Sequence, residues 1–295
     1  NTIPAIENAI SAGADYAEID VQLTADGVVV LTHDSNLKRM TGQDVDVDKT
    51  NYDEIAKLDA SGDFKNEYPN TKIPTLEEVM KVADGKIKLF IELKPTEGTE
   101  KELIAKTVKL IEDNNFMDQC AVQSLDYKLI EGVKEVNKDV QCAYCTPFLQ
   151  GDWEKLEAAD FLSVEQTYVT PLMVEKAGKN GKEIWAWTVD DAENTIRIIN
   201  TGDAMTGVIT NNPSMVRGTI YLDRTTDKFV HSIVVFMNGG DVPNIGNLVD
   251  EYVSVVQGTY GKVLDDNGEQ KTSADTNEKT SKRDEGNISF WEDKE

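Results

Sequence analysis

Short apolar, strand-like runs alternate with segments of helical periodicity from residue 1 to about residue 218. Repeated strand–helix units favour parallel sheets with right-handed crossovers, which is an α/β fold. The run at 28–33 follows the turn Ala25-Asp26-Gly27, so we predict that it is the return arm of a hairpin. The remaining barrel-type strands are predicted to begin at residues 17, 88, 120, 141, 161, 184 and 206. The nearest closed architecture is the (β/α)8 TIM barrel of about 250 residues, here without its first strand.

Helix-period segments between these strands carry start and stop signals. The segment 3–14 has helical spacing and ends near Gly13, while 75–85 begins with the capping residue Thr75 and stops at Gly85. The segment 101–115 is strongly amphipathic. Further helices are predicted at 125–137, 153–159, 171–181 and 192–202.

The pattern changes beyond residue 218. The run 228–237 is apolar and strand-like, and 247–264 fits a helix followed by a short strand. Residues 265–287 contain no aliphatic or aromatic residue larger than Ala274, so burial cannot offset the entropy of ordering them. We therefore predict a barrel at 1–218, an extension of unassigned role at 219–264 and an acidic, disordered tail at 265–295.

Charge excludes several kinds of partner. The 54 acidic and 30 basic residues give a formal net charge of -24, which repels nucleic acid and anionic membrane surfaces. A local cation in a pocket can still attract a phosphate substrate. No run approaches the roughly 18 consecutive apolar residues of a membrane span. Cys142 and Cys145 form a C-x-x-C without a second ligand pair, and on a strand they face opposite sides, so we interpret them as structural.

Acidic residues occupy strand positions where they are normally depleted. Glu18 and Asp20 are two apart and so share one strand face, as do Glu92 and Lys94 on another strand. Carboxylates that share a face repel each other and are costly to bury without a nearby positive charge. Three carboxylates that converge would suit a hard divalent cation, Ca²⁺ or Mg²⁺. The alternative is that these acids face solvent or pair with lysines.

His33 follows the hairpin and lies beside the acidic pair, where it could serve as a general acid or base. Asp34 could orient His33 or cap the next turn, and Lys94 could bind a phosphate oxygen. The other histidine, His231, lies early in its strand, and we interpret it as structural.

The stretch 1–42 resembles the opening of the glycerophosphodiester phosphodiesterase family. The resemblance continues through 52–64, 72–80, 88–94, 124–130, 184–191 and 207–216. It implies a metal-dependent (β/α) barrel that hydrolyses glycerophosphodiesters, its small-molecule substrates, to an alcohol and glycerol 3-phosphate. By position, the resemblance implies metal ligands at Glu18, Asp20 and Glu92. It also implies a catalytic His33, a phosphate-binding Lys94 and a substrate-pocket aromatic at Trp187.

The resemblance departs from the family at its start. Members carry a strand ending in His-Arg-Gly before the Glu-Asn-Thr of the first helix, and that strand supplies a second catalytic histidine and an arginine. This chain begins at Asn1-Thr2, so we expect a fragment with little activity, since such a proton-transfer group contributes about 10²–10⁴ in rate. The run 228–237 could fill the gap instead, although its histidine lies at the wrong end.

Two other functions stay open. One is a lysophospholipase-D-like activity on lipids, which would favour an apolar groove at the barrel mouth. The other is a catalytically silent module that binds phosphodiesters or tethers partners through the acidic tail. The resemblance also implies an extracellular or cell-surface location, with a membrane region upstream of this chain.

Overall fold

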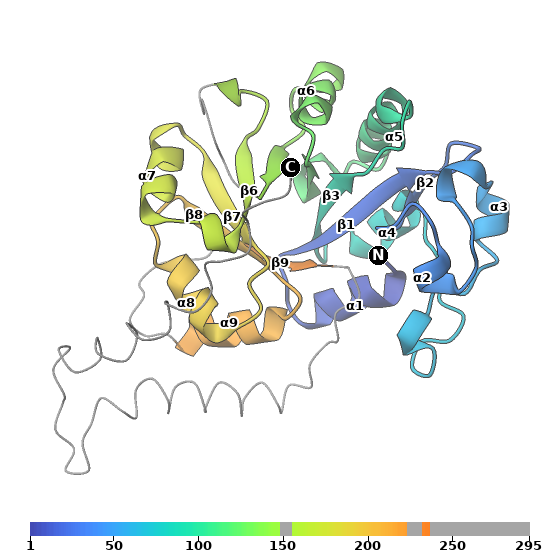
Figure 1. Ribbon diagram of the computed structural model, residues 1–295, viewed down its shortest axis with the longest axis horizontal. Helices are drawn as coiled ribbons and strands as arrows, with labels where there is room; N and C mark the ends of the chain where they lie inside the picture. Colours follow the sequence, from blue (N-terminus) through green and yellow to red (C-terminus); the bar gives the residue numbers. More distant parts are fainter. Residues whose placement is uncertain (148–154, 223–231, 237–295) are drawn as a thin grey trace, which may run out of the picture. The chain divides into compact units, whose positions relative to one another are not determined.

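The computed structural model describes residues 1–147, 155–222 and 232–236, all of which belong to one compact unit, Asn1–Ile245 (Figure 1). The strands are β1 Tyr16–Leu23, β2 Val29–Leu31, β3 Lys88–Leu93, β4 Cys120–Ser124, β5 Cys142–Thr146, β6 Phe161–Glu165, β7 Glu183–Trp187, β8 Met205–Thr210 and β9 Ser232–Phe236. The helices are α1 Ile3–Ser11, α2 Lys38–Thr41, α3 Tyr52–Ile55, α4 Leu76–Ala83, α5 Glu100–Asp113, α6 Tyr127–Val136, α7 Pro171–Lys179, α8 Ala192–Ile199 and α9 Pro213–Leu222.

The sheet closes on itself. Its strand order is β2-β1-β3-β4-β5-β6-β7-β8-β9, with a further parallel pairing between β9 and β1. β2 pairs antiparallel with the far end of β1, at Val21–Leu23, whereas β9 pairs with its start, at Tyr16–Glu18. The eight parallel strands therefore form the predicted α/β barrel, with β2 as the predicted hairpin arm.

β9 corrects one expectation. The sequence favoured an empty first strand position and a separate extension at 219–264, with the filling of the gap by 228–237 as the alternative. The structure follows the alternative, because residues 232–236 pair with both β8 and β1. The physical reason is that an open barrel leaves two facing edges of unpaired N–H and C=O groups, which an apolar strand can satisfy. His231 and the predicted elements at 247–264 and 265–295 lie outside the described residues.

Local signals determine several helix starts. Thr75 caps α4 by accepting from the Glu78 backbone, and the Glu78 side chain accepts from the Thr75 backbone in return. The helix predicted at 153–159 is wrong in its described part, because residues 155–159 are not α-helical. Side chains from elsewhere bind this backbone instead: Lys182 donates to the carbonyls of Leu156 and Ala159.

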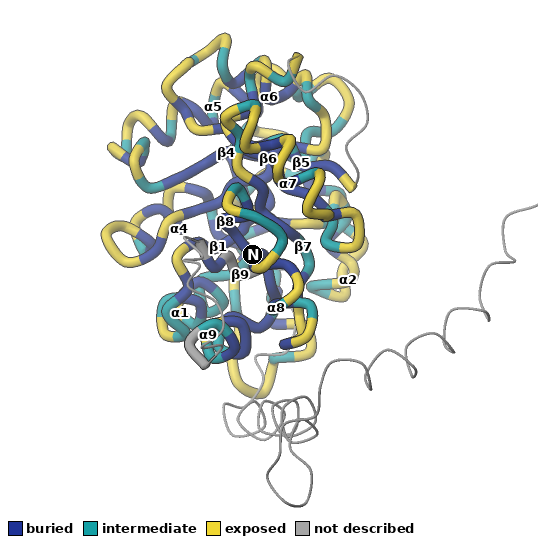
Figure 2. The backbone as a smooth tube through the Cα atoms, turned by 90° about the vertical axis from the view of Figure 1, so that its left-hand side faces the viewer, coloured by how far each residue is buried: buried dark blue, intermediate teal, exposed yellow. Residues whose placement is uncertain are grey.

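Side chains pack against both faces of the sheet. The strands are the most buried part of the described chain (Figure 2). The outer face packs against the helices, while an aromatic cluster of Tyr16, Phe90, Phe161 and Trp185 fills the interior. The rings of Phe161 and Trp185 lie 4.4 Å apart between centroids. Gly207 leaves room for Trp185, since a Cβ there would lie 2.4 Å from the indole.

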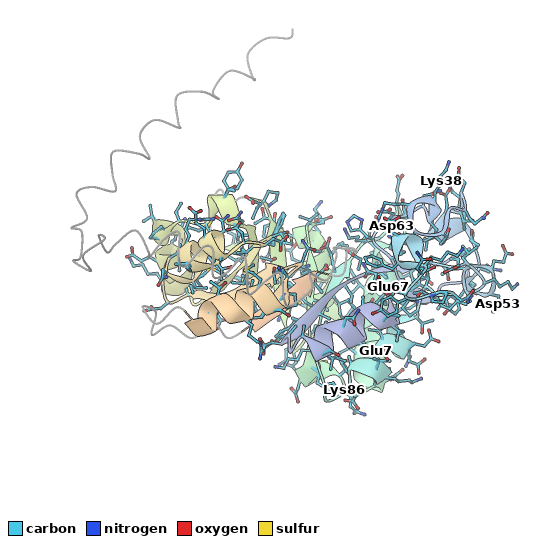
Figure 3. The ribbon with its side chains drawn as sticks, turned by 90° about the horizontal axis from the view of Figure 1, so that it is seen from below. Glu7, Lys38, Asp53, Asp63, Glu67 and Lys86 are labelled. Atoms are coloured by element: carbon cyan, nitrogen blue, oxygen red, sulfur yellow. The ribbon has the colours of Figure 1, made fainter. Side chains whose placement is uncertain are left out.

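Charged side chains cover the outside, as Glu7, Lys38, Asp53, Asp63, Glu67 and Lys86 illustrate (Figure 3). In the part of the chain that the structure describes, no helix combines the length and apolar character needed to cross a membrane. Cys142 packs in the outer cluster, whereas Cys145 lies near Glu92 and Glu18 inside the barrel, so the two do face opposite sides. Burial raises the pKa of Cys120 and of Cys142 to about 12.

Candidate metal centre

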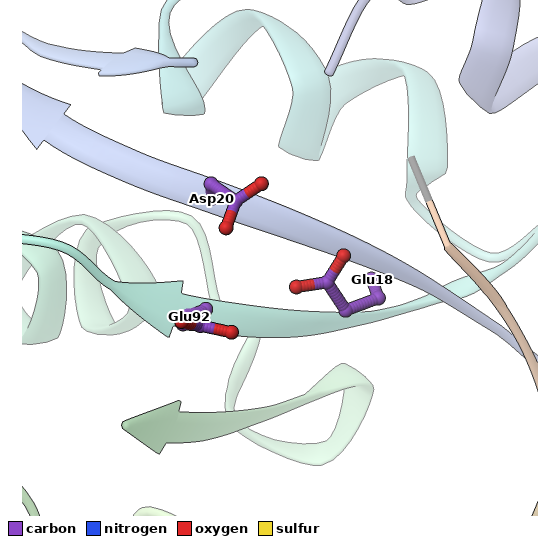
Figure 4. A group of neighbouring side chains, drawn as sticks. All are labelled: Glu18, Asp20 and Glu92. Carbon is purple, nitrogen blue, oxygen red and sulfur yellow. The ribbon is translucent and has the colours of Figure 1, made fainter. Parts of the chain in front are cut away.

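Three carboxylates converge inside the barrel. Glu18 and Asp20 point inward from β1, and Glu92 comes from β3, where it lies beside Asp20 in the strand register (Figure 4). Their exposed fractions are 0%, 1% and 7%, and one oxygen from each lies within 4.8 Å of the others. The structure thus brings together the three acids that the sequence selected. They are buried rather than facing solvent, which removes one of the alternatives.

Lys94 follows the end of β3 and lies between two of the acids. Its ammonium is 3.3 Å from Asp20 Oδ1 and 3.2 Å from Glu92 Oε1. Burial lowers the pKa of Lys94, but Asp20 and Glu92 outweigh that effect and raise it, so the group stays charged. The single positive charge of Lys94 is therefore shared by two carboxylates, whereas the cluster contains three.

The remaining negative charge is compensated only in part, because the Asn1 amino group and Lys94 act on Glu18 more weakly than burial does. Burial, followed by Asp20 and Glu92, raises the pKa of Glu18 well above its ordinary value. Burial also raises the pKa of Glu92, although Lys94 opposes this. Glu18 Oε2 is buried without a hydrogen-bond partner among the described residues. A cluster of carboxylate oxygens with an unpartnered buried oxygen fits a hard divalent cation, which would replace the missing positive charge.

His33 lies at the rim and is half exposed. Its Nδ1 is 2.8 Å from Asp34 Oδ1, and Asp34 in turn accepts from Arg39 at 2.6 Å. Arg39 holds the pKa of Asp34 below its ordinary value, and an ionised carboxylate can only accept, so His33 Nδ1 is the donor and Nε2 is left for other contacts.

Trp187 lies on β7 and packs against the interior aromatic cluster. Its indole Nε1 is buried and has no hydrogen-bond partner in the described part of the chain, as is also true of Trp185 Nε1 and Ser163 Oγ. Trp187 is therefore positioned inside the barrel with a free donor, and its contact with substrate stays a prediction.

Known proteins resemble this chain in sequence and in fold. Residues 1–215 match the glycerophosphoryl diester phosphodiesterase family. The chain belongs to that family. A glycerophosphodiester phosphodiesterase from Caldanaerobacter subterraneus is 32% identical over 222 residues, which cover 72% of this chain and 88% of that relative. A lysophospholipase D from Homo sapiens is 31% identical over 148 residues, covering 48% of this chain and 45% of that protein.

Solved structures of the glycerophosphoryl diester phosphodiesterase family agree with the fold. A phosphodiesterase from Oleispira antarctica, solved in complex with the product sn-glycerol-3-phosphate, superposes with a TM-score of 0.70 at 29% sequence identity. The match covers 75% of this chain and 91% of that one. The TIM-barrel class predicted from the sequence is thereby confirmed.

Sequence reasoning missed three residues at this site, one of which is Asn1, whose amide donates to Asp20 Oδ2 at 2.8 Å. Gln123 on β4 donates to Glu18 and Glu92, and Arg39 supports Asp34. Gln123 does carry a signal, because a polar side chain at an inward position of a buried parallel strand is unusual. Its partners are 105 and 31 residues away, so no local pattern connects them.

Proposed function

We propose that this chain is a metal-dependent hydrolase that converts glycerophosphodiesters to an alcohol and glycerol 3-phosphate. Family membership supports phosphodiester cleavage, and the relative solved with sn-glycerol-3-phosphate supports this product class. The observation that carries metal dependence is the convergence of three buried carboxylates within 4.8 Å, one of which has an unpartnered oxygen.

Glu18, Asp20 and Glu92 are the residues that would hold a divalent cation, and their oxygen-only donor set suits Mg²⁺ or Ca²⁺. Such an ion would neutralise the crowded acids and polarise the phosphodiester.

Lys94 and His33 supply the other chemistry. The Lys94 side chain is 24% exposed and charged, so it can contact both the acids and a phosphate oxygen. His33 Nε2 can take a proton from the attacking hydroxyl or return one to the leaving alcohol, with Asp34 orienting the ring.

Hydrolysis of glycerophosphocholine in EDTA, Mg²⁺ and Ca²⁺ tests this function, both for the chain itself and for a version in which a His-Arg-Gly strand joined ahead of Asn1 takes the place of β9 between β8 and β1. His33→Ala and Glu92→Gln should each remove several kcal/mol of transition-state stabilisation. Glu7→Gln, an exposed acid on α1, is the matched control and should leave the rate unchanged. Full turnover in EDTA, or by either site variant, would rule the assignment out.

Lysophospholipids are a second candidate substrate class, because a human lysophospholipase D is among the relatives. Three large apolar side chains are also exposed in the segments that follow β4 and β6, and barrel enzymes bind substrate at the carboxyl ends of strands: Leu125, Tyr168 and, at the start of α7, Leu172. If an acyl chain binds there, Leu172→Ser should lower kcat/KM for lysophosphatidylcholine and leave that for glycerophosphocholine unchanged. Equal effects on both substrates would exclude it.

A further inference from the structure

Gln123 connects the two strands that carry the acids. It lies on β4, beside Glu92 in the strand register, and only 2% of it is exposed. Its amide nitrogen donates to Glu18 Oε1 at 3.3 Å and to Glu92 Oε2 at 3.1 Å. An amide nitrogen carries two protons, and here each is directed at a different carboxylate.

Donors and carboxylates alternate across the cluster. Lys94 joins Asp20 to Glu92, and Gln123 joins Glu92 to Glu18. The two donors have different effects, because lysine adds positive charge whereas glutamine adds direction and no charge. Among the hydrogen bonds of the described residues, Gln123 is the donor to the Glu18 side chain, whose other oxygen has no partner. Glu18 therefore depends on Gln123 for its orientation.

The amide of Gln123 can take one orientation only. Turning it over would bring Oε1 against two carboxylate oxygens, which repel it, so the nitrogen must face the acids. Oε1 then faces away from them, and it is buried without a partner within the described residues. Amide oxygens bind hard cations or accept from the water on them, so an acceptor remains available at the edge of the cluster.

We propose that Gln123 is a positioning residue for the metal centre, which holds Glu18 and Glu92 in the arrangement that binds a divalent cation. This inference rests on the metal dependence proposed above. Without the bridge, the two buried carboxylates repel each other and turn apart, and the cation must reorganise them on binding. Residues that orient metal ligands typically contribute 10–100-fold to metal affinity.

Calorimetric titration of Mg²⁺ and of Ca²⁺ into the purified chain tests the proposal without depending on turnover. Gln123→Met keeps the side-chain length and removes both hydrogen bonds, so we expect metal affinity to fall by about tenfold or more. Gln123→Asn keeps the amide but is one methylene shorter and cannot reach both acids. We expect the same loss from it, and it replaces the methionine variant if that variant does not fold.

Thr107→Val is the matched control. Thr107 lies on α5 and also carries a buried polar atom without a partner, but it is outside the acidic cluster, so metal affinity should stay the same. In whichever of the two versions hydrolyses glycerophosphocholine, Gln123→Met should raise the Mg²⁺ concentration needed for half-maximal rate, with much of kcat recovered at saturating Mg²⁺.

The outcomes separate the two proposals. Metal binding by the unaltered chain with affinity within twofold for both Gln123 variants would overturn the positioning role and leave the function intact. Failure of the unaltered chain to bind metal would overturn metal dependence and, with it, this inference. If the Gln123 variants and Thr107→Val lost metal affinity to the same extent, the loss would reflect general destabilisation and would contradict a specific role of Gln123.

Discussion

The barrel interior contains two layers that differ in chemistry although the same strands build both. On β1, Tyr16 belongs to the lower layer, nearer the start of the strand, and Glu18 to the upper layer, nearer its carboxyl end. On β3, Phe90 belongs to the lower layer and Glu92 to the upper layer. The lower layer is a set of aromatic rings with centroids 4.4 to 5.6 Å apart. The upper layer holds the three buried acids and Gln123, and it includes the unpartnered oxygens Glu18 Oε2 and Gln123 Oε1. A step of two positions along one strand therefore leads from aromatic side chains whose packing stabilises the fold to acidic side chains whose burial destabilises it.

The two layers have opposite effects on the stability of the fold. Aromatic packing contributes apolar burial that holds the strands at their spacing. Crowded carboxylates oppose folding, as the raised pKa values of Glu18 and Glu92 indicate, and they are tolerated because the lower layer and the outer core support them. Substitutions in the two layers should therefore change different measurements.

The largest effect is expected from Glu18→Gln in the upper layer. It removes a cation ligand, so the rate of glycerophosphodiester hydrolysis should fall about 10³-fold, or roughly 4 kcal/mol. It also removes a crowded acid, so thermal unfolding in EDTA should occur at the same or a higher temperature. A much lower unfolding temperature would show that the upper layer stabilises the fold after all.

Phe90→Ala tests the lower layer and should have the opposite pattern. Phe90 is fully buried against Phe161 and Trp185, so the cavity should lower the free energy of unfolding by about 3–5 kcal/mol. Urea unfolding provides the measurement, and metal affinity of the folded fraction should change little. Loss of metal binding without loss of stability would break the distinction between the layers.

Gly207→Ala overpacks the lower layer. The new Cβ would lie 2.4 Å from the Trp185 ring, and relieving that clash should lower stability by about 1–3 kcal/mol. Gly178→Ala on α7 is the control, because its Cβ meets Ala204 at an ordinary 3.4 Å and alanine favours a helix. Equal urea midpoints for the two variants would contradict tight packing around Trp185.

Asp34→Asn, at the rim outside both layers, should have the smallest effect on stability. Arg39 lowers the pKa of Asp34 below its ordinary 3.8, so the stabilisation is present above that pH and is lost as the pH falls through the folded-state value. We expect a loss below about 1 kcal/mol at pH 7 that is smaller at pH 2. Urea unfolding at both pH values measures it, and a difference that grows in acid would refute the sign.

Strand alternation was sufficient to predict the acids. A period of two places Glu18 with Asp20 and Glu92 with Lys94 on common faces, and the carboxyl ends of parallel strands meet at one end of a barrel. Capping signals such as Thr75 with Glu78 likewise located α4, because their hydrogen bonds are local. These features depend on neighbours a few residues away, which the sequence displays directly.

The sequence by itself determined the barrel class, the inward face of β1 and β3, and the identity of the three acids. The tertiary structure decided that Asp20 lies beside Glu92, that Gln123 bridges Glu18 and Glu92, and that β9 pairs with both β8 and β1. The reason is sequence separation: periodicity and capping act within a few residues, whereas strand register and barrel closure depend on the packing of segments that lie far apart in the chain.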